Sequence, residues 1–245
     1  MSLGLLMAAL AGAGNIVGGM AVTARATWSD RTLKVFVALG AGFMLAVAFL
    51  EVLPRSRALT PLAFPLALAG YLLIHLFEHC LVPHFHFGEE TPRHVEQLSR
   101  AGGTAAAAGL TLHSFFDGLA IASGFLVSVP LGLLLFLAIL IHKLPEGFTL
   151  GSILLLTGRS PRQALAGTVW LGIACVAGAV AMNAARGWLG AGLALSAGAT
   201  LYVAASDLLP EANRERGVTF ALTVFGGVFL YFAAEGLLRL AGIGE

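Results

Sequence analysis

Residues 104–156 read TAAAAGLTLHSFFDGLAIASGFLVSVPLGLLLFLAILIHKLPEGFTLGSILLL and contain two long apolar runs, about 104–126 and 130–156. A membrane-spanning helix needs about 20 mostly apolar residues, and both runs are longer than that. Strands of a membrane barrel alternate polar and apolar residues, whereas these runs are uniformly apolar. The sequence therefore predicts two spanning helices, and each contains a histidine followed four residues later by a carboxylate.

The rest of the chain has the same apolar character. Of the 245 residues, 58% are hydrophobic and 11% are charged, against about a quarter charged in an ordinary soluble domain. This composition excludes a disordered chain, a nucleic-acid-binding domain, a secreted disulfide scaffold and almost any soluble enzyme. We predict an all-α integral membrane protein in which residues 1–245 form one transmembrane domain. The eight expected spans are about 3–23, 34–54, 62–82, 104–126, 130–156, 163–185, 188–210 and 217–240.

The basic residues outside the spans predict the orientation. Nine lie in the loops after the first, third, fifth and seventh spans, and four lie on the opposite side. Because Lys and Arg are more frequent in cytoplasmic loops, we expect both termini outside and the polar loop 83–103 in the cytoplasm. In a bacterial cell the protein would lie in the cytoplasmic (inner) membrane.

An internal repeat relates the two ends of the chain. The stretch from Ala41 to Pro54 aligns without a gap with Ala197 to Pro210, and Glu51 falls on Asp207. The segments 70–78 and 227–235 share the same Gly-to-Glu spacing, whereas the first and sixth spans match only weakly. Corresponding spans are five apart, an odd number, so the copies must insert in opposite orientations. We predict inverted repeats, about 1–82 and 163–240, around a central pair at about 104–156, which is a transporter architecture.

Each central span carries a potential pair of metal ligands. His113 and Asp117 are four residues apart, as are His142 and Glu146, so each pair shares one helix face. Both histidines lie roughly 14–18 Å from a membrane face, near the midplane. Two imidazoles and two carboxylates suit a divalent transition metal, with Zn²⁺ the first choice and Fe²⁺, Mn²⁺, Co²⁺ or Cd²⁺ open. The competing interpretation is two His–acid pairs that only join helices, although buried ionisable groups are costly in lipid.

Lys143 places a cation beside these ligands. One hypothesis is that its ammonium pairs with Glu146 or Asp117 and takes the place of a second metal ion, which leaves a single-metal site. The alternative is that it points elsewhere and pairs with a carbonyl group.

The chain resembles the ZIP (Zrt/Irt-like protein) family of divalent metal transporters along its whole length. The resemblance rests on the eight spans, the loop after the third span, the H-[SN]-x-x-[DE]-G motif at 113–118 and the H-x-x-P-E-G motif at 142–147. It implies Zn²⁺ uptake into the cytoplasm by alternating access. It also implies a metal site between the central helices, formed by His113, Ser114, Asp117, His142 and Glu146.

The chain departs from the family pattern at several positions. Members with two metals have an acid at the position of Lys143 and often an Asn at that of Ser114, and no acid is found in the sixth span. Many members have His-Glu where this chain has Ser206-Asp207, ahead of Pro210-Glu211. These differences bear on the number of metals, the selectivity and the rate.

Further polar residues lie near the ends of spans. We expect Glu51 and Glu235 at the outer face to collect cations, and Glu78 and Asp207 at the inner face to release them. Alternatively, each is a helix-end charge in headgroup water. A histidine cluster could receive the released metal, or it could be a solvated loop. The residues of this predicted metal path are Glu51, Glu235, His75, Glu78, His79, His84, His86, Asp207 and Glu211.

Three functions remain open from the residues. The first is a metal transporter, and the others are an intramembrane metalloenzyme and a metal-binding membrane protein without flux. The chain has neither an H-E-x-x-H motif nor a G-x-S-x-G nucleophile motif, which argues against an enzyme. The expected partners are divalent metal ions and the lipid bilayer, with no nucleic acid, and the Gly-rich helix faces allow a homodimer.

Overall fold

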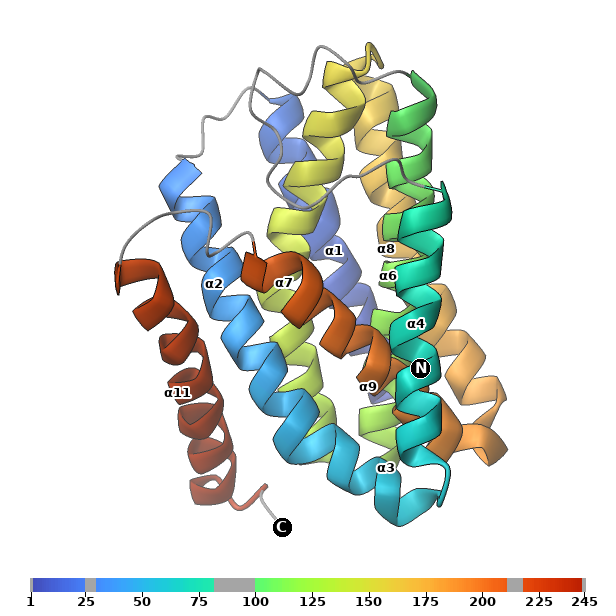
Figure 1. Ribbon diagram of the computed structural model, residues 1–245, viewed down its shortest axis with the longest axis vertical. Coiled ribbons are helices and arrows are strands. Elements are labelled where there is room, and N and C mark those ends of the chain that lie inside the picture. The colour runs from blue at the N-terminus through green and yellow to red at the C-terminus, as the bar shows by residue number, and fades with distance from the viewer. Residues whose placement is uncertain (1, 25–29, 82–99, 211–217, 244–245) are drawn as a thin grey trace.

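The computed structural model describes residues 2–24, 30–81, 100–210 and 218–243, and every regular element in these ranges is a helix (Figure 1). The α-helices are α1 (Leu3–Thr23), α2 (Asp30–Val47), α3 (Leu53–Leu59), α4 (Ala63–Leu81), α6 (Arg100–Val127), α7 (Val129–Leu156), α8 (Pro161–Ala184), α9 (Leu189–Tyr202) and α11 (Val218–Leu240). Two π-helical segments, η1 (Ala48–Val52) and η3 (Val203–Leu208), and a short 3₁₀ turn, η2 (Arg186–Trp188), complete the fold.

The predicted all-α membrane fold is confirmed. Among the described residues, seven helical runs are long and apolar enough to cross a membrane, and α2, η1 and α3 together form one of them. The one predicted span not among these seven is the third, which corresponds to α4 and has a shorter apolar section, Ala63–Phe77. The chain runs alternately up and down through these eight elements (Figure 1). Many large apolar side chains, such as Phe225 and Phe229 of α11, are exposed and suit a lipid solvent.

The two helices that carry the motifs form a tight antiparallel hairpin. α6 ends at Val127, α7 begins at Val129, and Ser128 alone lies between them. The Ser128 hydroxyl accepts a hydrogen bond from the Leu131 amide, and Pro130 occupies the first turn of α7. Both features stabilise a helix N-terminus, so the local sequence fixes where α7 begins.

The inverted repeat is visible in the packing. α2 packs against α11, and α9 packs against α4. Gly42 approaches the carbonyl of Val224, and its repeat counterpart Gly198 approaches the carbonyl of Ala67 so closely that a Cβ at either glycine would collide. In Figure 1 α2 descends where α9 ascends, and α4 ascends where α11 descends, as inverted copies require.

The weakly matching first and sixth spans, α1 and α8, follow the same symmetry. Gly18 of α1 abuts the carbonyl of Leu144 in α7, and Gly178 of α8 abuts the carbonyl of Phe115 in α6. Where α1 and α8 cross, Gly12 and Gly172 meet backbone to backbone. The backbone contacts of α1 with α7 and of α8 with α6 are therefore alike, although the sequences of α1 and α8 match only weakly.

The packing regroups the repeats in space. In the sequence, the first and sixth spans, α1 and α8, each belong to one of the two repeats. In space, α1 and α8 pack against α6 and α7, and these four helices form a unit that we term the central block. The remaining helices, α2, α3, α4, α9 and α11, form the flanking block. Where the blocks meet, a Cβ added to Gly40 of α2 would lie 3.5 Å from Ile141 Cγ2 and 3.6 Å from His142 Cβ, which are ordinary van der Waals distances. The two blocks are therefore less tightly interlocked at Gly40 than the helices of the central block are at their glycine-to-backbone contacts.

The two π-helical segments occupy equivalent repeat positions. The amide of Leu53 donates to the carbonyl of Ala48, and the amide of Leu209 donates to that of Ala204, each five residues back. A proline follows each segment at 54 and 210 and removes an ordinary helical hydrogen bond. The sequence alignment placed an acid in each segment but did not predict the wider turn, which is frequent at functional sites.

Candidate metal centre

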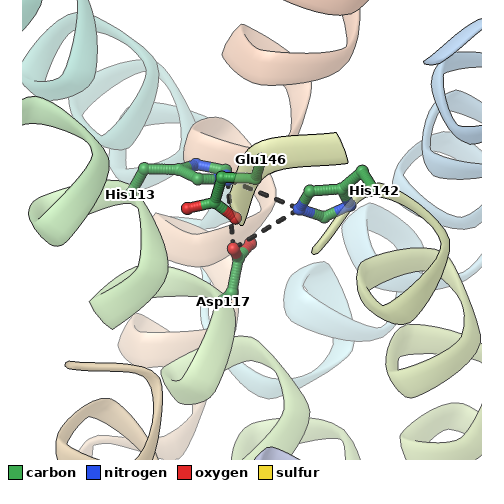
Figure 2. A group of neighbouring side chains, drawn as sticks. All are labelled: His113, Asp117, His142 and Glu146. Atoms are coloured by element: carbon green, nitrogen blue, oxygen red, sulfur yellow. Dashed lines mark hydrogen bonds and ion pairs between the residues drawn. The ribbon is translucent and has the colours of Figure 1, made fainter. Parts of the chain in front are cut away.

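His113 and Asp117 of α6 and His142 and Glu146 of α7 converge in one buried cluster (Figure 2). One potential ligand atom from each of the four lies within 4.8 Å of all the others. The Asp117 carboxylate points between the two imidazoles, and Glu146 lies beside them (Figure 2). The structure therefore brings together the four residues that the spacing predicted on facing helix surfaces.

Three of the ligand atoms have the separations of a small metal site. His113 Nε2 lies 3.0 Å from Asp117 Oδ2 and 3.4 Å from His142 Nε2, and His142 Nε2 lies 3.5 Å from Asp117 Oδ2. Tetrahedral Zn²⁺ with bonds of about 2.0–2.1 Å requires ligand atoms about 3.3 Å apart. The triangle of atoms fits one face of such a tetrahedron.

The hydrogen bonding of His142 leaves the required nitrogen available. Its Nδ1 lies 3.0 Å from the carbonyl oxygen of Ala138, one turn earlier in α7. A carbonyl only accepts, so Nδ1 carries the proton and Nε2 presents its lone pair to the cluster. Fixing the ring from behind in this way is typical of metal-binding histidines.

Lys143 contacts both carboxylates of the cluster. Its Nζ lies 2.6 Å from Asp117 Oδ2, pairs with Glu146 Oε2 and donates to Ser114 Oγ at 2.8 Å. Ser114 in turn donates to Glu146 Oε1 at 2.7 Å. Of the two sequence interpretations, the pairing with Asp117 and Glu146 is the one observed. The Lys143 side chain is fully buried, and its Cβ faces Gly14 of α1 within the central block.

Burial makes the charge balance of this cluster significant. Lys143, Ser114 and Glu146 are fully buried, and His113, Asp117 and His142 are at most 3% exposed. Two carboxylates and one ammonium leave one net negative charge when both imidazoles are neutral. A negative charge in a low-dielectric interior favours a cation strongly.

Close helix packing holds the site residues on a rigid frame. Gly118, next to Asp117, abuts the carbonyl of Cys175 in α8, and Gly147, next to Glu146, abuts the carbonyl of Asn15 in α1. The sequence predicted close approach at these two glycines, and the structure confirms it. All the cluster residues belong to the central block, and His142 lies where that block meets α2.

Glu51 and Glu235 lie apart from the cluster but near each other. They line one pocket of about 260 Å³ together with Arg55, Arg239 and the start of α7. Glu51 sits in η1 and accepts hydrogen bonds from the Tyr231 hydroxyl at 2.9 Å and from Arg55 Nε at 3.0 Å. Glu235 pairs with Arg239. Each acid therefore has an arginine partner four residues later.

The other predicted path residues are described in part. Asp207 is buried in η3, at the position equivalent to Glu51. His75 is exposed on α4, and its ring packs edge-on against Tyr202, with ring centroids 5.8 Å apart. Glu78 and His79 belong to α4, but their side chains lie outside the described part of the structure. His84, His86 and Glu211 lie outside the described residues.

Several polar residues lie next to the predicted site residues but were not predicted from the sequence. Arg55 was detectable, because it follows Glu51 by one helical turn. Tyr231 and Ser128 are brought to this region only by packing. Asn15 is fully buried in α1, and neither of its side-chain amide atoms has a hydrogen-bond partner within the described residues.

Two histidines and two carboxylates are buried together in this helical membrane protein, and such a cluster could hold a metal ion. The family model described as ZIP zinc transporter matches residues 94–235, more than half of the chain, and the chain belongs to this family.

Three relatives show the range of similarity. The chain is 31% identical over 147 residues to zinc transporter SLC39A7 of Rattus norvegicus, a match that covers 53% of this chain and 31% of that protein. It is 32% identical over 143 residues to metal cation symporter ZIP8 of the same species, covering 53% and 30%. It is 39% identical over 110 residues to metal cation symporter ZIP14 of Xenopus tropicalis, covering 42% and 22%. The match therefore spans less than a third of the length of each relative.

Proposed function

We propose that this chain carries divalent transition-metal ions, most favourably Zn²⁺, across a membrane into the cytoplasm by alternating access. The observation that carries the proposal is the buried set His113, Asp117, His142 and Glu146, in which Asp117 and the two imidazoles have the spacing of a metal site midway along α6 and α7. The family membership supports the same function, since its model describes zinc transporters. The whole chain would act as one transport domain.

The site would hold one metal ion. Lys143 occupies the space between Asp117, Glu146 and Ser114, which a second cation would need. Its ammonium supplies one positive charge there permanently, so a second divalent ion would meet both electrostatic repulsion and steric exclusion. His113 and His142 would then face the single ion, and Asp117 lies between the two imidazoles (Figure 2).

The contacts within the central block are tighter than its contact with α2 at Gly40, and this difference would allow the two blocks to move relative to each other. Glycine-to-backbone contacts join α1, α6, α7 and α8, while the contact of Gly40 with the central block is through side chains at ordinary distances. Side chains can slide past one another more easily than interlocked backbones. We propose that the central block moves against the flanking block as a unit and carries the ion with it.

The proposal also includes the orientation of the chain in the membrane and the path of the metal ion. The excess of basic residues supports an orientation with both termini outside and the 83–103 loop in the cytoplasm. The pocket with Glu51 and Glu235 would then open outside and attract cations, and Asp207 would lie on the cytoplasmic side with the histidines of α4 and the loop. The Gly-rich faces permit a homodimer, which transport by this mechanism does not require.

Metal uptake into proteoliposomes tests the function. Radioactive Zn²⁺ should enter vesicles containing the wild-type protein and should not enter vesicles containing His113→Ala or Glu146→Ala, with equal insertion checked for each. Competition by Fe²⁺, Mn²⁺, Co²⁺ and Cd²⁺ in the same assay gives the selectivity. Arg57→Ala, an exposed change on α3, serves as a matched control and should transport normally.

The same assay separates the alternatives. Metal binding without metal-dependent flux in correctly inserted wild-type protein would contradict transport and leave a metal-binding membrane protein. Turnover of a peptide or lipid substrate that depends on metal and on His113, again without flux, would indicate a metalloenzyme.

A further inference from the structure

Arg55 links the two blocks at the end of the molecule where α6 and α7 meet. Its Nε donates to Glu51 Oε2 in the flanking block at 3.0 Å, and its guanidinium donates to Ser128 Oγ at 3.1 Å. Ser128 is the single residue between α6 and α7, the helices that carry the metal cluster. One side chain thus spans from the flanking block to the turn of the central hairpin.

The acid at the other end of this link is held firmly. Glu51 is 9% exposed, lies in the π-helical segment η1 and receives a second hydrogen bond from Tyr231 of α11. The carboxylate is therefore anchored to the flanking block on two sides. Arg55 is the more exposed partner, with its side chain 25% exposed beside the 260 Å³ pocket that it lines.

The pocket gives a cation access to the same carboxylate. Glu51, Arg55, Glu235 and Arg239 all line it, so both acids face one space and each is neutralised by its own arginine. A monovalent ion brings no more charge than the guanidinium it would replace. A divalent ion brings twice that charge and can be shared by two carboxylates, so it alone competes effectively for Glu51.

We propose that Arg55 is a latch that a divalent cation opens. With the pocket empty, Arg55 ties the α6–α7 turn to Glu51 and holds the central block against the flanking block. A divalent ion bound to the Glu51 and Glu235 carboxylates displaces the guanidinium, which releases Ser128 and frees the hairpin to move. The proposal rests on the proposed transport function, and it makes Arg55 a positioning residue that couples cation arrival to block movement.

Hydrogen–deuterium exchange of the purified full-length protein in detergent tests the latch without relying on flux. In the wild type, ZnCl₂ should accelerate amide exchange in residues 123–131, and NaCl at the same ionic strength should not. Arg55→Gln should exchange there about tenfold faster without metal, as the loss of one charge-assisted hydrogen bond predicts, and Zn²⁺ should add little. Arg57→Gln, two residues away, exposed and carrying the same charge change, should behave like the wild type.

Two further variants test whether Arg55 acts as a latch. In His113→Ala, which lacks a central ligand but keeps Glu51, Zn²⁺ should still accelerate exchange of the turn, and an absent response there would overturn the latch. Arg55→Gln indistinguishable from Arg57→Gln would overturn it as well. A wild-type protein without any metal flux in proteoliposomes would instead refute the transport function, so the two failures are distinguishable.

Discussion

At the scale of single residues, Lys143 is the most unusual feature of the site. A buried ammonium between two carboxylates is favourable only because both partners and Ser114 satisfy it. From the sequence, the Lys143 ammonium could pair either with an acid or with a carbonyl group. The structure shows that it pairs with Asp117 and Glu146. The equivalent motif position on α6 is Ser114, so the two helices of the central hairpin contribute different chemistry to one cluster.

Replacing this ammonium by a carboxylate should change the number of bound metals. Lys143→Asp places a third acid beside Asp117 and Glu146, and the added negative charge favours a second cation there. We expect bound Zn²⁺ to rise from one to two per chain, measured by elemental analysis of purified protein. Arg57→Asp, with the same change in total charge on exposed α3, should stay at one. An unchanged stoichiometry and affinity in Lys143→Asp would contradict the substitution of a metal by Lys143.

At the scale of the elements, glycines decide how closely the helices approach. Gly147 meets the backbone of Asn15, whereas Gly151, one turn later on α7, has its nearest neighbour, Gly19, at 3.5 Å from the position of a Cβ. The first position has no room for a methyl group, and the second has ordinary van der Waals space.

This contrast predicts opposite effects of the same substitution. Gly147→Ala should destabilise the protein by about 1–3 kcal/mol through overpacking. Gly151→Ala should be neutral or stabilising by up to about 1 kcal/mol, because alanine is the better helix former. Thermal unfolding in one detergent measures both. Equal unfolding temperatures for the two variants would show that α1 does not pack on α7 as described.

The elements also show what the sequence could predict. Long apolar runs determine the spans, so the bounds of α1 and α7 were predictable to within about a residue. The spacing of four residues put His113 and Asp117 on one face. The crossing of α1 and α8 was not predictable, because it depends on the backbone contact between Gly12 and Gly172, which leaves little trace in the side-chain pattern. The Tyr231 contact with Glu51 joins residues 180 positions apart and needed the structure.

At the scale of the whole molecule, a bound ion should stabilise the fold. The ligands come from two helices of one block, and unfolding separates them, so metal binds the native state preferentially. At a free Zn²⁺ concentration 100 times the dissociation constant, the expected gain is about 2.7 kcal/mol. The unfolding temperature should therefore rise with Zn²⁺ and fall again with a chelator. The same shift in His113→Ala would locate the stabilising ion elsewhere.

The fixed charge of Lys143 has a consequence for energetics across the whole membrane. With the ammonium in place, the site carries one negative charge when empty and one positive charge when it holds a divalent ion. A voltage that is negative inside would draw the loaded site inward and drive the vacant one back out, so it assists both halves of the cycle. Two charges are worth about 4.6 kcal/mol per 100 mV. Uptake under potassium–valinomycin potentials should rise steeply with inside-negative voltage, and a voltage-independent rate would show that a compensating ion moves with the metal.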